Sequence, residues 1–539
     1  MILSIVLLLL ALNVTAAGLD QPAEHSSEAT AHDAGADHSG PSGSKADHHA
    51  AEDAHAEHNG DTHHEDDHGG AHGDHGSEEI PLIKWLACIP FVVLLLCIAI
   101  LPLMHKTEHW WEDNKNRLFI SLVLSAIVLL FYWTIHPGVV DHHTHEILTG
   151  HAAVEKVLEH AVLDEYIPFI TLLFSLYVIS GGIQLKGDLP AHPMTNTAFI
   201  GIGALIASFI GTTGAAMLLI RPLLQTNRER KHVTHTVIFF IFLVCNCGGC
   251  LLPIGDPPLF LGYLRGVPFE WTLALWPQWL AVNIVLLVVY LIWDSMAYKK
   301  ETIKDIIKDE TQVEKLQLRG QINFLFLLGV VFCVAFLIPG KPLFGNESLP
   351  VVPNYFREFM QMVFVGASLF FTPRGLRKEN NFNYTAIGEV AALFIGIFIT
   401  MQVPLEILNQ IGPRMGLDQP WQFFWITGTL SSFLDNAPTY VVFFETAKTL
   451  PTPEGVALVA GLSEELLVAI SLGAVFMGAN TYIGNGPNFM VKSIAEQSGV
   501  KMPSFFGYMA YSVGILVPIF LVLTYVQQAV IQGWLIFGK

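Results

Sequence analysis

Charge is scarce in this 539-residue sequence. Lys, Arg, Asp and Glu make up 14% of the chain, hydrophobic residues make up 52%, and the mean hydropathy is +0.48. This composition excludes a soluble protein of this length and predicts a polytopic membrane protein built of helices. The net charge of −19 comes mostly from residues 20–79, which hold 16 acidic residues and one basic residue. Nucleic acid is therefore not an expected partner, whereas membrane lipid is.

Common catalytic motifs are also missing. The sequence has no Ser/His/Asp arrangement, no His-Glu-x-x-His motif and no Walker glycine loop, and no histidine follows His235. Neither an enzyme nor a required cofactor is therefore expected. The six cysteines all lie in apolar segments, which excludes a disulfide framework in the N-terminal tail. Cys245, Cys247 and Cys250 have no histidine or second cluster beside them, so small residues lining a helix are favoured over a metal site.

The N-terminus lacks a basic residue before its apolar run, but residues 1–17 otherwise resemble a signal peptide. An uncleaved membrane anchor is the alternative. Residues 18–79 show no sustained apolar periodicity and are predicted to form a disordered, exported tail. The tail holds twelve of the 23 histidines, and its tightest groups predict a weak metal site, for example for Zn²⁺, at His48, His49, His63, His64 and His68. The alternative is a solvated acidic linker.

Apolar segments of spanning length recur through the rest of the chain. Two of them, residues 195–224 and 421–447, are interrupted by polar clusters and are predicted to be re-entrant hairpins. The loop 137–165 is rich in histidine and acidic residues, and we expect a surface flap with a helix in its later part rather than a metal site. Ten segments are predicted membrane spans, at about residues 82–104, 118–136, 166–185, 233–262, 274–295, 321–339, 358–372, 385–403, 464–491 and 507–530.

Lys and Arg distinguish the two sides of this layout. With the tail exported, 18 basic residues fall in inside loops and nine fall outside, while Arg221 lies within a hairpin. This bias predicts a multi-pass protein of a bacterial inner membrane. A first transporter repeat (80–297), a basic cytoplasmic linker with an amphipathic surface helix (298–319) and a second repeat (320–539) follow the tail. The predicted fold is all-α, with about ten transmembrane helices and two re-entrant hairpins in two inverted repeats.

Two short motifs that break apolar segments resemble each other. Residues 252–260 read Leu-Pro-Ile-Gly-Asp-Pro-Pro-Leu-Phe, and residues 481–489 read Thr-Tyr-Ile-Gly-Asn-Gly-Pro-Asn-Phe. Broken helices at matching places in two halves of a transporter indicate a binding site near the middle of the membrane. The residues predicted to break the helices are Gly248, Gly249, Gly255, Pro257, Pro258, Gly484, Gly486 and Pro487.

Asp256 and Asp435 indicate which kind of ligand is bound. A carboxylate near the bilayer centre costs roughly 2.5–3.5 kcal/mol, so it needs a cation, a proton or water. At about 6 Å it would repel an anion by about 3 kcal/mol at an effective dielectric constant near 20, so a cation is favoured. One carboxylate can hold either H⁺ or a metal ion, which is sufficient for antiport. Glu389 is a candidate proton relay, and snorkelling towards the inner surface is the alternative.

Neutral oxygen atoms near the four breaks complete the predicted site. Hard cations such as Na⁺ prefer oxygen ligands, and hydrogen bonding between helices is the alternative for any one residue. The predicted shell consists of Thr212, Thr213, Asn246, Asn436, Thr439, Asn480, Thr481 and Asn485.

At these residues the sequence resembles the NhaD-type sodium/proton antiporters, a branch of the ion transporter superfamily that also includes arsenite, citrate and dicarboxylate carriers. The matching pieces lie within residues 179–183, 211–216, 246–258, 389–398, 435–439 and 478–488. The resemblance covers about residues 80–535, and it implies an elevator-like motion and a homodimer. Dicarboxylate carriers typically have Ser-Asn-Thr at both hairpin tips, whereas this chain has Gly-Thr-Thr and Asp-Asn-Ala-Pro-Thr.

The sequence therefore predicts a secondary antiporter that exchanges Na⁺ or Li⁺ for H⁺. Asp256 and Asp435 would hold the cation and the proton. A carrier of organic anions or arsenite, and a metal-ion transporter that uses the His-rich tail, are the alternatives.

Overall fold

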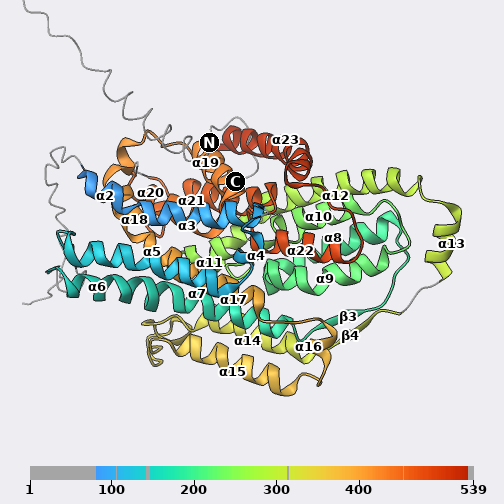
Figure 1. Cartoon of the computed structure of the whole chain (residues 1–539), viewed down its shortest axis with the longest axis horizontal. Helices are drawn as coiled ribbons and strands as arrows, with labels where there is room; N and C mark the ends of the chain where they lie inside the picture. Colours follow the sequence, from blue (N-terminus) through green and yellow to red (C-terminus); the bar gives the residue numbers. More distant parts are fainter. Residues whose placement is uncertain (1–79, 105, 141–145, 312–314, 453–454, 532–539) are drawn as a thin grey trace, which may run out of the picture. The chain divides into compact units, whose positions relative to one another are not determined.

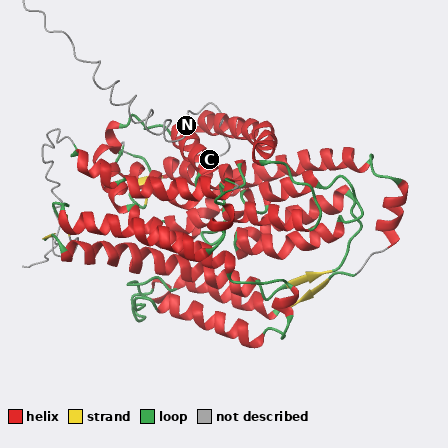
Figure 2. Cartoon of the chain, in the orientation of Figure 1, coloured by secondary structure: helices red, strands yellow, loops and turns green. Residues whose placement is uncertain are grey.

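The computed structural model (Figure 1) describes residues 80–104, 106–140, 146–311, 315–452 and 455–531. The predicted signal peptide, tail and histidine metal site lie outside these residues. Helices dominate the described part, and the few strands form three two-stranded antiparallel ladders (Figure 2). The ladders pair β1 (Val139–Val140) with β2 (Ile147–Leu148), β3 (Gln184–Lys186) with β4 (Gln317–Arg319), and β5 (Leu458–Val459) with β6 (Leu462–Ser463).

The all-α membrane architecture is confirmed. By length and apolar composition six described stretches can cross a membrane: Leu82–Ile100, Asn114–Thr134, His151–Ser180, Pro193–Ile210, Phe269–Tyr298 and Phe505–Ala529. A seventh, Thr385–Thr400 with Gln402–Arg414, is bent by 43°. The other predicted spans correspond to shorter or broken helices. Pro and polar residues therefore interrupt more of the apolar sequence than hydropathy alone indicates.

The helices outside the hairpins and broken elements follow the predicted order. Local signals fix some of their ends: the Asp113 side chain accepts a hydrogen bond from the Lys115 N–H at the start of α5. These helices are α2 (Leu82–Ala87), α3 (Ile89–Ile100), α4 (Glu108–Trp111), α5 (Asn114–Thr134), α6 (His151–Leu158), α7 (Ile167–Ser180), α12 (Trp276–Tyr298), α13 (Ile303–Thr311), α14 (Ile322–Phe336), α15 (Phe356–Phe371), α16 (Leu376–Glu379), α17 (Thr385–Thr400), α18 (Gln402–Ile411) and α23 (Phe505–Ile531).

Both interrupted stretches fold back on themselves. Helix α8 (Pro193–Ile210) turns at Gly211, whose φ is +81°, into α9 (Thr212–Thr226), and Leu219 of α9 lies against Gly203 of α8. Helix α19 (Pro420–Phe433) turns into α20 (Asn436–Lys448), and the rings of Phe423 and Phe443 lie 6.3 Å apart. Each pair is therefore a helical hairpin, with its tip at the polar cluster.

Two elements are broken in the middle as the motifs predict. In the first half, α10 (Thr234–Leu243) is followed by a 3₁₀ turn, Cys247–Cys250, and then by α11 (Pro257–Leu264). In the second half, α21 (Glu464–Met477) is followed by a 3₁₀ turn, Gly478–Asn480, and then by α22 (Gly486–Gln497). Proline in the first turn of α11 and of α22 favours a new helix there, because its missing N–H is not needed at that position.

The hairpin and broken element of each half contact those of the other half. Helix α11 packs against α20, the second arm of the second hairpin, and α22 packs against α9, the second arm of the first hairpin. Likewise α10 contacts α22, and α21 contacts α11. Such an exchange is expected of two repeats related by a two-fold axis. The repeat boundaries at residues 80–297 and 320–539 stay a prediction.

The loop 137–165, predicted to be a surface flap, differs from the prediction in one respect. A helix forms in its later part, but α6 continues through a π-helical stretch, Glu159–Tyr166, into α7 without a break. The third span thus begins at His151 rather than near residue 166. Hydropathy misses this extension because the π-helical stretch carries two glutamates and an aspartate.

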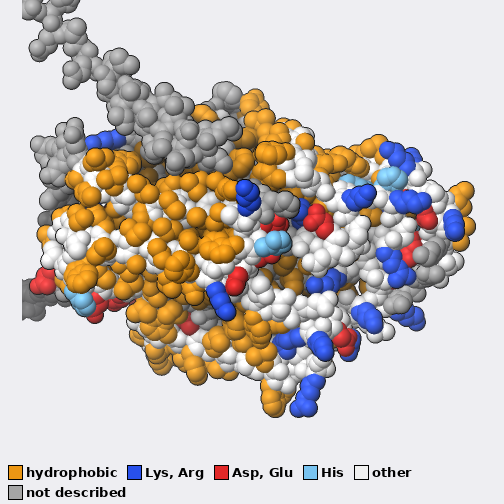
Figure 3. Space-filling model, viewed as in Figure 1, with side chains coloured by type: hydrophobic (Ala, Val, Ile, Leu, Met, Phe, Trp, Pro, Cys, Tyr) orange, Lys and Arg blue, Asp and Glu red, His pale blue; other side chains and the backbone are white. Residues whose placement is uncertain are grey.

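The linker contains the predicted helix, α13, with exposed Ile303 and Ile307. The last residues of the linker form β4, which pairs with β3 after α7, and no sequence pattern predicts this ladder. Figure 3 shows Lys and Arg side chains gathered on the end of the molecule that carries α13, β3 and β4, while apolar side chains cover the face beside it. This distribution agrees with the predicted bias of basic residues.

Candidate functional site

The two broken elements share one backbone construction. A Cβ added to Gly255 would lie 2.1 Å from the Gly249 carbonyl oxygen, and a Cβ added to Gly484 would lie 2.5 Å from the Gly478 carbonyl oxygen. The aligned glycines are therefore needed because the backbone approaches itself closely, and none of the four has a positive φ. Gly248 is equally confined, by the backbone of Ala204, whereas Gly486 is exposed and its Cβ position is open.

Asp256 lies at the centre of the site and is 1% exposed. Its Oδ1 accepts hydrogen bonds from the Thr212 hydroxyl at 2.9 Å and the Asn485 amide at 3.0 Å. Its Oδ2 accepts a hydrogen bond from the Asn436 amide at 2.7 Å. Both carboxylate oxygens are thus bound by neutral donors, which stabilise the charged form without a basic side chain.

The three donors come from equivalent places. Thr212 and Asn436 are the first residues of the second arms, α9 and α20, so both hairpin tips reach the same carboxylate. Asn485 and Asp256 are the residues that precede α22 and α11, and neither side chain caps its own helix. Four helix N-termini, those of α9, α11, α20 and α22, therefore meet at Asp256. Each contributes a partial positive charge that stabilises an anion.

A second layer of amides holds the first. The Asn246 amide donates to the Asn488 side chain at 2.8 Å, and Asn485 donates to the Asn246 side chain at 3.3 Å and to the Cys245 carbonyl at 3.0 Å. Asn488 in turn donates to the backbone carbonyls of Gly478 and Thr481, both at 2.9 Å. These bonds join the unwound backbone of the two halves through side chains buried in the core.

Two buried acceptors at the site have no hydrogen-bond partner among the described residues. They are the side-chain oxygens of Asn436 and Asn480. An unpaired buried carbonyl oxygen is costly, so such an atom next to a carboxylate is a candidate cation ligand. Neither Asp256 nor Asp435 forms an ion pair with a Lys, Arg or His of the described part of the chain.

Asp435 is at the tip of the second hairpin but is bonded differently. Its carboxylate accepts the Ala437 N–H at 3.1 Å and thereby caps α20, and the side chain is partly exposed. The Thr439 hydroxyl donates to the Asp435 carbonyl at 3.0 Å, so it serves the helix backbone. Thr213 lies on the first tip and is partly buried, with no side-chain hydrogen bond in the described structure.

The remaining predicted ligands serve the second hairpin. The Asn480 amide donates to the Ser432 hydroxyl at 2.9 Å, and the Thr481 hydroxyl donates to the Ser432 carbonyl. Ser432 and Asn488 are site residues that the predicted shell omitted. Asn488 had a signal in the sequence, because it is an amide where the aligned position in the first motif is the apolar Leu259. Serine in an apolar helix is too common to single out Ser432.

Glu389 forms no hydrogen bond with the Asp256 cluster in the described structure, although it interacts electrostatically with Asp435. Its carboxylate pairs with Arg117 of α5 at 3.0 Å, so the ion pair gives it a partner within the protein. Glu445 of α20 pairs with Arg265 at 3.1 Å, and Arg265 also binds buried Glu165 in the π-helical stretch. Among the described residues, neither glutamate forms a hydrogen bond or ion pair with the predicted shell.

In the described residues, no three His, Cys, Asp or Glu side chains come together in a group that could hold a metal ion. Cys245, Cys247 and Cys250 are buried free thiols around the first break. The prediction that they line the helix stays a prediction.

The described core matches a family of transporters. The model of the family CitMHS_2, whose description is "Putative citrate transport", matches residues 80–527, from α2 to nearly the end of α23. A comparison with curated proteins finds no match.

Proposed function

Because the chain belongs to the "Putative citrate transport" family and is a multi-pass membrane protein, we propose that it is a secondary antiporter exchanging Na⁺ or Li⁺ for H⁺. Membership in a transporter family supports a carrier rather than an enzyme. The NhaD-type specificity and the choice of cation rest on the site.

One observation carries the proposal. The Asp256 carboxylate lies beside the unpaired Asn436 oxygen, the Thr212 hydroxyl and the unwound backbone, in a cluster that has no basic side chain among its described contacts. This set is rich in oxygen and carries one buried negative charge, which suits a hard monovalent cation. A tricarboxylate would require counter-charges that these side chains do not supply.

Exchange would follow from competition at one carboxylate. With a cation bound, the Thr212 and Asn436 side chains would turn their oxygen atoms toward the ion, since hydroxyl and amide groups can both donate and accept. With a proton bound, Asp256 would become neutral and the cation would lose its main ligand. Asp435, at the tip of the second hairpin, would be the second carboxylate.

The test is cation-induced dequenching of a pH-sensitive dye in everted membrane vesicles that contain the full chain. Na⁺ or Li⁺ is expected to cause dequenching, and Asp256→Asn is expected to remove it while Lys501→Gln is not. Absence of any response to either ion from the wild-type chain would exclude this function.

An organic-anion carrier is the second candidate. The family description and the four helix N-termini at the site favour it, because N-termini stabilise anions. Uptake of labelled citrate or succinate that depends on Asn436 and Asn485, without any cation-induced dequenching, would favour this candidate over antiport.

The orientation of the protein in the membrane is also part of the proposal. The tail would be exported and the end bearing α13 would be cytoplasmic, as supported by the basic side chains gathered there (Figure 3). A homodimer would follow from the resemblance to the NhaD-type antiporters, and a bacterial inner membrane and loose Zn²⁺ capture by the tail are proposed from the sequence.

A further inference from the structure

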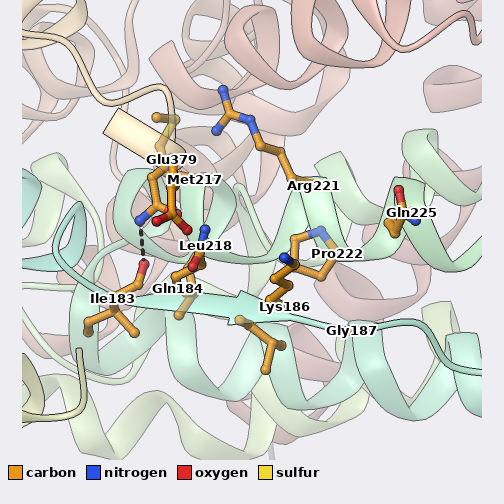
Figure 4. A pocket seen from close by; sticks show the side chains of 12 residues that line it. Ile183, Gln184, Lys186, Gly187, Met217, Leu218, Arg221, Pro222, Gln225 and Glu379 are labelled. Carbon is orange, nitrogen blue, oxygen red and sulfur yellow. Dashed lines mark hydrogen bonds between the residues drawn. The ribbon is translucent and has the colours of Figure 1, made fainter. Parts of the chain in front are cut away.

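A cavity of about 520 Å³ lies beside the first hairpin (Figure 4), and none of its lining residues belongs to the Asp256 cluster. The second arm, α9, forms one wall with Arg221 and Gln225, and β3 forms another with Lys186. Glu379, the last residue of α16, and Asn380, which follows it, complete the lining. The volume of the cavity lies in the range of sites that hold small molecules, about 300–1,000 Å³.

The charges that line this cavity do not balance. Arg221 is partly buried on an arm that the sequence places within the membrane, and within the described residues its guanidinium has no hydrogen bond and no ion pair. Among the described residues that line the wall, Glu379 is the one carboxylate, and Arg319 of β4 already binds it at 2.6 Å. The Asn380 amide is committed to the carbonyls of Gly181 and Ile183. Arg221 and Lys186 therefore leave the cavity positive.

The second hairpin shows what Arg221 lacks. Glu445 follows the tip residue Asn436 by the same nine positions that separate Arg221 from Thr212. Its carboxylate is bound by Arg265 at 3.1 Å and approached by Lys448 at 3.6 Å. The charge on one arm is thus satisfied inside the protein, while the charge on the equivalent position of the other arm faces a cavity.

We propose that this cavity is a binding site for a small anion bearing a phosphate or carboxylate group. The planar guanidinium of Arg221 would bind two oxygens of the anion. Lys186 would add a second positive charge at β3, and Gln225 would offer a neutral hydrogen-bond donor. The anion has two sources, a free solute or the headgroup of an acidic lipid. The site would join the hairpin to the β3–β4 ladder, and it does not depend on what the Asp256 site transports.

The test uses the purified full-length protein in neutral maltoside micelles. Tris phosphate and Tris citrate are titrated at constant ionic strength against Tris chloride, and the thermal unfolding midpoint is followed. Tris replaces sodium, so the proposed transport cation does not contribute. A second arm compares nanodiscs of phosphatidylcholine with and without phosphatidylglycerol. A saturable rise in micelles identifies a free anion, whereas a rise only with phosphatidylglycerol identifies a headgroup.

Arg221→Gln is expected to weaken the response about tenfold or more, and Lys186→Gln to weaken it less. Arg221→Lys should have an intermediate effect, because it keeps the charge but loses the fork, and it also serves if the glutamine variant does not fold. The matched control Lys501→Gln, an exposed basic residue elsewhere, should respond as the wild type does. The proposal is overturned if neither anion nor headgroup raises the midpoint, or if both Arg221 variants respond like the wild type.

Discussion

The two broken helices have the same backbone and different chemistry. Each unwinds where two glycines pack against each other, and each restarts with proline in its first turn. The first break places a carboxylate, Asp256, before the new helix, and the second places an amide, Asn485, there. At the hairpin tips the order is reversed, with Gly211 in the first half and Asp435 in the second.

This difference distinguishes the residues that shape the backbone from those that form the binding site. The glycine pairs recur because close backbone approach leaves no alternative residue, whereas the polar side chains at the same places are free to differ. One carboxylate per half, at the break in one and at the tip in the other, gives the site two acids in different surroundings. One is buried and bound by three donors, and the other is partly exposed and caps a helix.

Moving the carboxylate between the halves is the strongest test of this comparison. Residues that only hydrogen-bond to metal ligands contribute about 10–100-fold to metal affinity. Asp256 is proposed as a direct ligand, so Asp256→Asn is expected to lower the apparent Na⁺ affinity about 100-fold or more. The exchanged pair Asp256→Asn with Asn485→Asp returns a carboxylate to the same hydrogen-bonded cluster and should recover part of the activity. Dye dequenching in everted vesicles measures both variants. Wild-type activity in Asp256→Asn alone would contradict the assigned role.

Asp435 is expected to have the next largest effect. Asparagine also caps helices, so Asp435→Asn removes the charge while keeping the cap, and exchange should fall about tenfold or more. Asp435→Ala removes both, and should in addition lower the free energy of unfolding by about 1 kcal/mol. Vesicle assays and thermal unfolding separate the two contributions. Equal stability of the two variants would argue against the capping bond.

The glycine pairs can be tested by adding one methyl group. Gly255→Ala and Gly484→Ala place a Cβ on a carbonyl oxygen, and each should cost about 1–3 kcal/mol of stability, or more where the backbone cannot shift. Gly486→Ala is the matched control, because nothing lies within 4 Å of its Cβ position. Thermal unfolding in detergent measures all three. A control as unstable as the other two would refute the packing argument.

The smallest expected effect concerns the loops that follow the hairpins. In the first half, Glu301 accepts hydrogen bonds from the N–H groups of Lys231 and His232, while the β5–β6 ladder lies in this position in the second half. Burial of Glu301 would raise its pKa, but these N–H groups and the His232 ring more than offset that, so the pKa lies below its usual value of 4.5. The resulting stability is fully present above pH 4.5 and is lost as the pH falls through the lowered pKa.

Glu301→Gln should therefore unfold at a slightly lower temperature than the wild type at neutral pH, and the difference should shrink below pH 4.5. Glu496→Gln, at an exposed pair with Lys492, is the control and should change little at either pH. A difference for Glu301→Gln that does not depend on pH would mean that the carboxylate charge is not what holds this loop.

Sequence was sufficient for the features that repeat. The two breaks, the two hairpins and the order of the helices follow from hydropathy, glycine, proline and the doubled motif, because these act on local backbone. Asp256, Thr212, Asn436 and Asn485 were all predicted as site residues, and the structure brings them into one cluster.

The rest depends on contacts that no local signal encodes. The partner of Glu389 is Arg117, which lies on another helix far away in the sequence. The β3–β4 ladder joins residues on either side of four intervening helices and a broken element. The extension of α7 was missed because acidic residues within a π-helical stretch have the same hydropathy as a loop.

The four close-packed glycines also bear on how the protein could move. None of them has a positive φ, and a Cβ added to Gly249, Gly255 or Gly484 would clash with its neighbours, so the unwound segments are closely packed. Bending these segments to release a cation from Asp256 would disturb this packing. The ligands of such a cation come from both hairpins and both breaks, so an arrangement in which they move as one body, as the resemblance implies, would keep this packing intact.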